Sequence, residues 1–142
     1  AVLAGLAIRS LLQALRRAGD RRRDRRQRAA DQLRNEGTQR LWSGDTRGAT
    51  KALGQAVRRR PDDLEAALAL ARSHEEREEW AAALEILEGL RASRQGSESR
   101  LLSRIGRLAL RTGNSGAASA AFREAVYSDG VLHEMYDNKP TS

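Results

Sequence analysis

Few side chains in this sequence have the types and spacing that metal binding or enzyme chemistry requires. The two histidines, His74 and His133, are far apart, and neither has the spaced histidine or carboxylate partners of a zinc site. We therefore interpret His74 as a histidine of the core or its rim. The chain contains no cysteine, which excludes disulfides, thiolate metal sites and cysteine nucleophiles.

The other candidates for catalysis have simpler interpretations. Ser73 and Ser103 fall within expected helices and have no neighbouring base. The glycine-rich residues 113–116 lack the preceding strand and the lysine of a phosphate loop, so they indicate a helix-hairpin turn. Four glutamates near one expected helix end predict solvated charge rather than catalytic carboxylates. These are Glu75, Glu76, Glu78 and Glu79. The sequence therefore predicts no enzyme activity, no catalytic residue, no metal and no cofactor.

One charge pattern does indicate binding. Arg100, Arg104, Arg107 and Arg111 recur at intervals of four, three and four residues, which places them on one face of a helix. Guanidinium groups in such a stripe suit an acidic segment or a C-terminal carboxylate. The alternative is partial neutralisation by glutamates of a neighbouring helix. These glutamates are Glu65, Glu75 and Glu76. The two interpretations are compatible, and both stay open.

The elements that must position these residues are helices. Alanine, leucine, arginine and glutamate dominate the composition, whereas aromatic residues make up only 4%. This composition favours an all-α fold. A length of 142 residues suits one domain with tails.

A repeat of 34 to 35 residues organises most of the chain. It is anchored at expected turns beginning at Gly44, Glu78 and Gly113. Small residues recur before and after each turn, and a large apolar residue follows at a constant offset. The equivalent sets are Gly37, Ala71 and Gly106; Ala49, Ala83 and Ala118; and Leu53, Leu87 and Phe122. Small residues allow helix axes to approach, and the larger ones are expected to fill the space between successive helix pairs. The pattern predicts helices over about 22–43, 46–59, 63–77, 80–93, 99–112 and 115–128.

Residues 30–132 resemble the tetratricopeptide repeat family, whose unit is a pair of antiparallel helices repeating about every 34 residues. The resemblance implies an α-solenoid of about three helix hairpins, with units near 30–63, 64–98 and 99–132. Pro61 closes the first unit, and Asp62 or Asp63 then caps the next helix. Ser97 or Ser99 would cap the third unit.

Three departures from the family pattern accompany this resemblance, and one of them is Leu90 in place of a small residue in the second unit. Glu36 and Arg40 replace an apolar and an aromatic residue in the first unit, where a four-residue spacing allows them to pair. The second unit has Glu78 and Glu79 in place of a turn glycine. The geometry of that turn is therefore open at this point.

The resemblance also implies a function and a site. Proteins of this family bind other proteins in a concave groove lined by the first helix of each pair, so the chain is expected to be a non-catalytic scaffold or adaptor. The groove would take a protein partner, with an acidic segment as the candidate ligand. Its expected residues are Arg34, Asn35, Trp42, Arg72, Arg100, Arg104, Arg107 and Arg111.

The N-terminal residues 1–28 form a separate basic arm. Residues 1–8 are uniformly apolar, and residues 9–28 contain nine arginines against only Asp20 and Asp24. The arm thus carries a net charge of +7, which equals the formal net charge of the whole chain. The repeats are electrically balanced as a consequence.

An apolar segment followed by arginines favours a membrane contact. Eight residues are too few to span a bilayer, so residues 1–8 would be the cytoplasmic end of a membrane helix that begins upstream, or part of an amphipathic surface helix. The alternative is a helix packed on the repeats of a soluble adaptor. Nucleic acid is disfavoured, because no aromatic residue interleaves the arginines. The expected membrane-contact residues are Leu3, Leu6, Ile8, Leu11, Leu12, Arg16, Arg17, Arg21, Arg22 and Arg23.

The order of parts resembles bacterial membrane-anchored repeat proteins of the HemY type or of the lipopolysaccharide assembly protein B type. The likeness implies membrane association with the repeats on the cytoplasmic side. The alternative is a cytoplasmic adaptor or a small accessory subunit of a larger complex. Residues 133–142 form the C-terminal tail, and a short helical turn that includes Val131 and Leu132, with Met135 and Tyr136, is expected to cap the last repeat.

Overall fold

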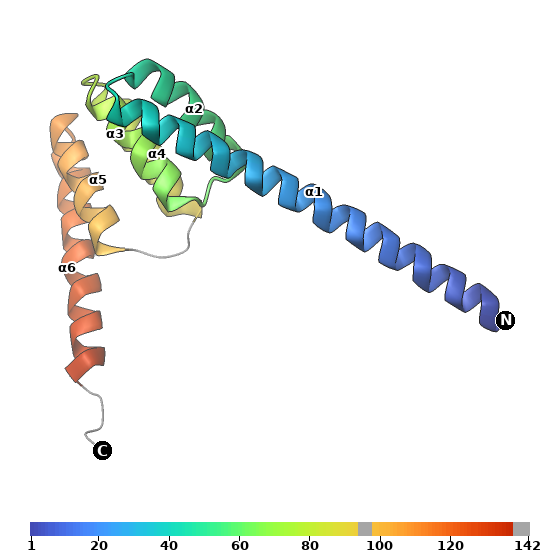
Figure 1. Ribbon diagram of the computed structural model, residues 1–142. Coiled ribbons are helices and arrows are strands. Elements are labelled where there is room, and N and C mark those ends of the chain that lie inside the picture. The colour runs from blue at the N-terminus through green and yellow to red at the C-terminus, as the bar shows by residue number, and fades with distance from the viewer. Residues whose placement is uncertain (94–97, 138–142) are drawn as a thin grey trace.

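The chain is an α-solenoid built from three stacked helix hairpins. The computed structural model describes residues 1–93 and 98–137, and it describes side chains as far as Asp129. Each helix packs against the next one in the chain, and α1 also contacts α3 (Figure 1). The six helices are α1 (Val2–Trp42), α2 (Thr46–Arg59), α3 (Leu64–Glu75), α4 (Trp80–Ser93), α5 (Ser99–Arg111) and α6 (Ser115–Asp137). The predicted all-α solenoid fold is confirmed.

All three hairpin turns share one backbone geometry. Gly44 and Gly113 have φ values of +85° and +78°, the left-handed region that glycine adopts without steric cost. Glu78 occupies the same place in the second turn, with φ +58°. In each turn the residue that follows donates its backbone N–H to the carbonyl five residues earlier, as Glu79 does to His74 at 2.9 Å. The second turn therefore keeps its shape without glycine.

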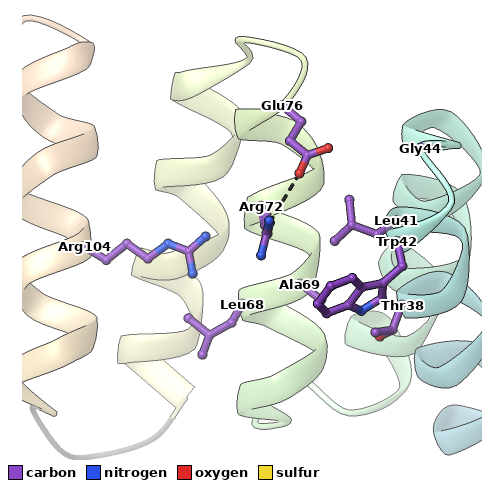
Figure 2. Close-up of a pocket in the computed structure, with 9 residues that line it drawn as sticks. All are labelled: Thr38, Leu41, Trp42, Gly44, Leu68, Ala69, Arg72, Glu76 and Arg104. Carbon is purple, nitrogen blue, oxygen red and sulfur yellow. Dashed lines mark hydrogen bonds and ion pairs between the residues drawn. The ribbon is translucent and has the colours of Figure 1, made fainter.

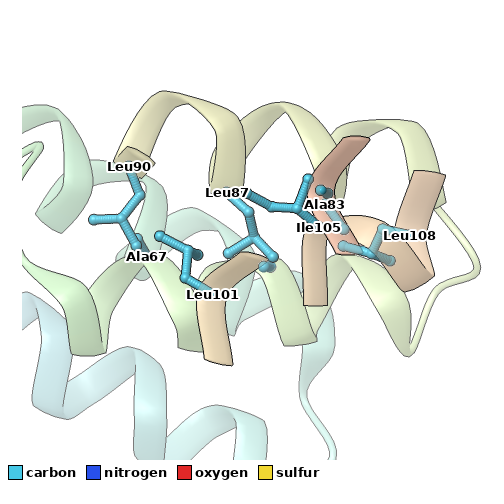
Figure 3. Close-up of a cluster of buried hydrophobic side chains, with 9 residues drawn as sticks. Ala67, Ala83, Leu87, Leu90, Leu101, Ile105 and Leu108 are labelled. Atoms are coloured by element: carbon cyan, nitrogen blue, oxygen red, sulfur yellow. The ribbon is translucent and has the colours of Figure 1, made fainter. Parts of the chain in front are cut away.

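The small and large residues of the repeat meet across each hairpin. A Cβ added to Gly37 would lie 2.5 Å from Leu53 Cγ, and one added to Gly106 would lie 2.7 Å from the Phe122 ring. The equivalent Ala71 and Leu87 are both fully buried in one cluster that joins α3, α4, α5 and α6. Figure 3 shows Leu87 within this cluster. Close approach of the helices thus depends on the absence of a larger side chain at these positions.

Polar side chains tie the first and second hairpins together. Asp63 caps α3 by accepting a hydrogen bond from the Ala66 N–H at 3.1 Å, and it also accepts one from Arg34 at 3.0 Å. The hydroxyl of the fully buried Ser73 lies 2.7 Å from the Leu70 carbonyl and 3.0 Å from the Thr50 hydroxyl. These partners satisfy Ser73, which agrees with its interpretation as a structural residue.

Two expectations about the chain ends were wrong. The N-terminal arm is not packed on the repeats: residues 1–28 are exposed throughout, and they continue the first repeat helix as one 41-residue helix that projects from the body (Figure 1). The second helix of the third pair does not stop near residue 128, because α6 continues to Asp137. Residues 131–136, which were expected to form a short helical capping turn, are part of α6, and their side chains lie outside the described ones, so their capping role stays a prediction.

One smaller expectation also fails. The third pair begins with Glu98 at the N-cap position, and the Glu98 side chain makes no capping hydrogen bond. Ser99 is the first helical residue rather than the cap, and Ser97 lies outside the described residues. By contrast, the predicted pair of Glu36 and Arg40 forms, with 2.8 Å between charged atoms.

Candidate partner-binding groove

The first helices of the three hairpins line one continuous hollowed face. A hollow of about 530 Å³ lies between the C-terminal end of α1, the middle of α3 and the Arg104 side chain of α5. Figure 2 shows Trp42 and Arg104 reaching toward α3 from opposite sides, with Leu68 and Arg72 between them. Adjoining hollows continue along α1 and along α5. The structure thus brings the expected groove residues onto one face.

The floor of this groove is apolar at its centre. Trp42 is 81% exposed although it is a large aromatic side chain, and it lines two adjacent hollows together with Leu68 and Ala69. Sequence reasoning missed Leu68 and Ala69. The repeat contained the signal, because these residues lie 34 positions after Arg34 and Asn35, which the resemblance had placed in the groove.

Several groove arginines are neutralised within the chain. Arg34 lies 3.0 Å from Asp63, and Arg72 lies 3.3 Å from Glu76. Arg104 donates through two nitrogens to one oxygen of Glu75, at 2.7 and 3.1 Å. All of these pairs join groups within the repeats, and the first and last connect different helices. The charges of these three arginines are therefore already balanced by carboxylates of the same chain.

The four glutamates of the acidic cluster were predicted to be solvated charges. Three of them instead have partners within the chain. Glu75 and Glu76 hold Arg104 and Arg72. Glu79 lies 2.6 Å from His74 Nδ1, and this hydrogen bond is the main cause that lowers the pKa of the Glu79 carboxyl below its ordinary value of 4.5, with a smaller contribution from Arg77. His74 lies half-buried at the turn, consistent with a rim histidine.

The remaining groove arginines differ in this respect. Within the described part of the chain, Arg100, Arg107 and Arg111 make no ion pair. Arg111 stacks on the Trp80 ring, with its guanidinium carbon 4.8 Å from the ring centroid. Together with Arg107 and Trp80, Arg111 lines a small hollow of about 180 Å³. Of the predicted stripe, only Arg104 is neutralised by the neighbouring helix, because Glu65 and Glu76 face other arginines.

The arm forms a second exposed surface. Its apolar side chains are between 49% and 82% exposed, and its arginines are exposed as well. Among the described helices, none is long and apolar enough to cross a membrane.

No cluster of three or more metal-ligating side chains occurs among the described residues.

Comparisons with known proteins support the fold. The tetratricopeptide repeat family model matches residues 41–105. The crystal structure of MamA protein superimposes with a TM-score of 0.66 at 18% sequence identity. The match covers 76% of this chain and 58% of that chain, so this chain corresponds to little more than half of the matched protein. No curated protein matches this chain in sequence.

Proposed function

Because the chain carries tetratricopeptide repeats, we propose that it is a protein-binding scaffold whose concave groove takes an acidic segment of a partner and whose arm tethers it to a membrane. Repeats of this family support protein–protein interaction in general. The acidic partner and the tether are the specific parts of the proposal. Nothing in the groove requires a catalytic step.

The observation that carries the acidic-partner proposal is the contrast among the groove arginines. Arg34, Arg72 and Arg104 have carboxylate partners, whereas Arg100 and Arg107 have none among the described residues. Unpaired guanidinium groups beside an apolar floor suit a ligand that presents both carboxylates and an apolar side chain. Trp42 and Leu68 would receive the apolar side chain, since both line the central hollow.

A selection from a random 12-residue peptide library displayed on phage tests this proposal. We expect the wild-type protein to enrich peptides rich in Asp and Glu with at least one large apolar residue. Replacement of Arg100, Arg107 and Arg111 by Glu should abolish this enrichment, while Arg104 is retained so that its bond to Glu75 survives. Binding should weaken with salt, because exposed charges are screened over about 10 Å at 0.1 M.

A matched control makes the same change of charge outside the groove. Arg47, Arg58 and Arg59 are exposed on α2 and line none of the hollows of the concave face. Their replacement by Glu should leave the selected peptides unchanged. If the groove variant and wild type select the same peptides, the three unpaired arginines are ordinary surface charge and the acidic-partner proposal is wrong.

The tether rests on the exposed apolar side chains of the arm and the arginines that follow them. Co-sedimentation with vesicles of phosphatidylcholine containing phosphatidylglycerol tests it. We expect binding to the anionic vesicles, and we expect loss of binding when Leu11 and Leu15 are replaced by Gln. A chain that stays in the supernatant would instead support the alternative, a soluble adaptor whose arm packs on another protein.

A further inference from the structure

The arginines of the arm surround the helix rather than flanking one face. Residues 16–28 contain eight arginines and two aspartates, a net charge of +6. At 100° per residue, the widest arc of the helix without an arginine is about 100°, and it contains Asp20 and Asp24. We call these eight residues the arginine collar. They are Arg16, Arg17, Arg21, Arg22, Arg23, Arg25, Arg26 and Arg28.

The end of the arm beyond the collar is apolar on opposite sides. Leu6 and Ile8 are 54% and 59% exposed, and two residues of helix place them about 160° apart. Val2, near the side of Leu6, is 78% exposed. A helix that lies in a membrane surface has one apolar face and one polar face. Residues 2–8 do not have this division, whereas residues 9–15 place Leu11, Leu12 and Leu15 on one side and Arg9, Ser10 and Gln13 on the other.

The position of α2 also opposes a flat orientation. Leu12 precedes Gly37 by 25 residues, so their Cα–Cβ directions on α1 differ by only about 20°. Gly37 faces Leu53 of α2, and α2 therefore lies on the same side of α1 as Leu12. If the arm lay flat on that side, α2 and its exposed Lys51 and Arg58 would be pressed into the same lipid surface.

We propose that α1 stands across the headgroup layer of an anionic bilayer, with residues 2–15 at hydrocarbon depth and the arginine collar among the headgroups. Arg9 lies six residues, or about 9 Å, deeper than Leu15, and its long side chain would extend back toward the headgroups. This inference rests on the membrane tether proposed above. Fourteen residues of helix extend about 21 Å, which exceeds the roughly 15 Å of one hydrocarbon leaflet. A collar of charge on all sides matches a helix that is surrounded by phosphates where it crosses the headgroups.

Anionic lipid suits this surface better than a second copy of the arm. If two arms paired in parallel through their apolar ends, their two collars would lie side by side. Each collar segment carries a net charge of +6, so the two would repel each other. Anionic lipid supplies the opposite charge instead. Because α1 is continuous, the arm also fixes the height of the groove: Arg34 follows Arg28 by six residues, or about 9 Å along the helix.

Site-directed spin labelling of the full chain tests the orientation, since the natural sequence contains no cysteine that would compete. Single variants such as Leu6→Cys and Ile8→Cys are labelled and bound to vesicles containing phosphatidylglycerol. Collision with oxygen and with a water-soluble nickel complex then reports depth. We expect depth to fall by about 1.5 Å per residue from residue 3 to residue 26, so labels at 6 and 8 should differ by only about 3 Å although they lie on opposite sides of the helix. A label at Lys51→Cys serves as the exposed control.

The collar gives a second, independent readout. Arg22 and Arg26 lie roughly opposite Arg17 and Arg28 on the helix. If the helix stands upright, the double replacement of either pair by Gln should weaken binding to anionic vesicles by a similar factor, roughly 30-fold for two arginines. If the helix lies flat on the side of Leu11 and Leu15, only the replacement of Arg22 and Arg26 should matter.

The outcomes separate this inference from the tether on which it rests. Binding with a depth that oscillates every 3.6 residues would keep the tether and overturn the upright orientation. Absence of binding to vesicles would overturn both. Labels that are shielded without vesicles, in a chain that is dimeric, would identify a second copy as the occupant and would also overturn both.

Discussion

Substitution of Gly37 by alanine tests the close approach of α1 and α2. The added Cβ would lie 2.5 Å from Leu53 Cγ, 2.9 Å from Leu53 Cδ2 and 3.1 Å from the Leu53 backbone nitrogen. Leu53 is fully buried, so its side chain has no open space into which it can rotate. The third distance involves backbone, and its relief requires α1 and α2 to move apart.

Two opposing effects determine the size of this change. Alanine favours a helix interior over glycine by roughly 1 kcal/mol, whereas overpacking of a close-packed core costs roughly 1–3 kcal/mol. The matched control is Gly54→Ala in α2, where no atom lies within 4 Å of the added Cβ. We expect Gly54→Ala to stabilise the protein by roughly 1 kcal/mol, and we expect Gly37→Ala to be less stable than Gly54→Ala by roughly 1–3 kcal/mol.

Urea denaturation monitored by circular dichroism measures both free energies of unfolding. Gly106→Ala provides an internal comparison, because the three atoms nearest to its new Cβ all belong to the ring of the half-buried Phe122, the closest at 2.7 Å. A ring can shift more readily than backbone, so we expect a smaller penalty there than at Gly37. If Gly37→Ala stabilises the protein as much as Gly54→Ala does, α1 and α2 do not approach as closely as described, and the reasoning is refuted.

Three further predictions concern the turns and the core. Ala83→Leu or Ala118→Leu should destabilise by roughly 1–3 kcal/mol in thermal melts, since both side chains are at most 1% exposed; unchanged melting of both would contradict close packing. Glu78→Gly should stabilise by up to about 1 kcal/mol, because glycine removes the cost of about 1–2 kcal/mol of a left-handed conformation but adds its own entropy. The hydrogen bond to His74 lowers the pKa of Glu79 in the folded protein. The contribution of Glu79 to the free energy of unfolding is therefore complete above its ordinary pKa of 4.5, and it is lost as the pH falls through its lower pKa in the folded state. Wild type should therefore lose more stability than Glu79→Gln as the pH falls below about 4.5, and parallel pH profiles of the denaturation midpoint would contradict this.

Local patterns predicted the repeat helices well where a short-range physical rule applied. The left-handed turns at Gly44 and Gly113 follow from the steric freedom of glycine, and the caps at Asp45 and Asn114 follow from a side chain that accepts a backbone hydrogen bond at 2.9 or 3.0 Å. The period identified the small and the large residues, but it placed the large ones between successive helix pairs, whereas Leu53 meets Gly37 within one hairpin. These relations depend on neighbours within one hairpin.

Predictions failed where a local signal did not decide whether a helix continues. Gly19 and Asp20 precede the expected helix start near residue 22 just as Gly44 and Asp45 precede α2, yet α1 runs through them to Trp42 without interruption. Packing against the repeats begins near Ala29 and Ala30, and the spacing of small and apolar residues indicates this point. A helix can nevertheless extend beyond the last residue that it buries, as α1 does. The same reason applies to α6, which continues past residue 128.

The sequence by itself determined the all-α composition, the repeat and the helical face that carries Arg100, Arg104, Arg107 and Arg111, because residue spacing sets direction along a helix. It did not decide which of these charges is available to a ligand. An ion pair between helices, such as Arg104 with Glu75, depends on how the hairpins stack. The tertiary structure alone therefore separated the neutralised arginines from the unpaired ones, since the distance between charges on different helices is a property of packing and not of residue order.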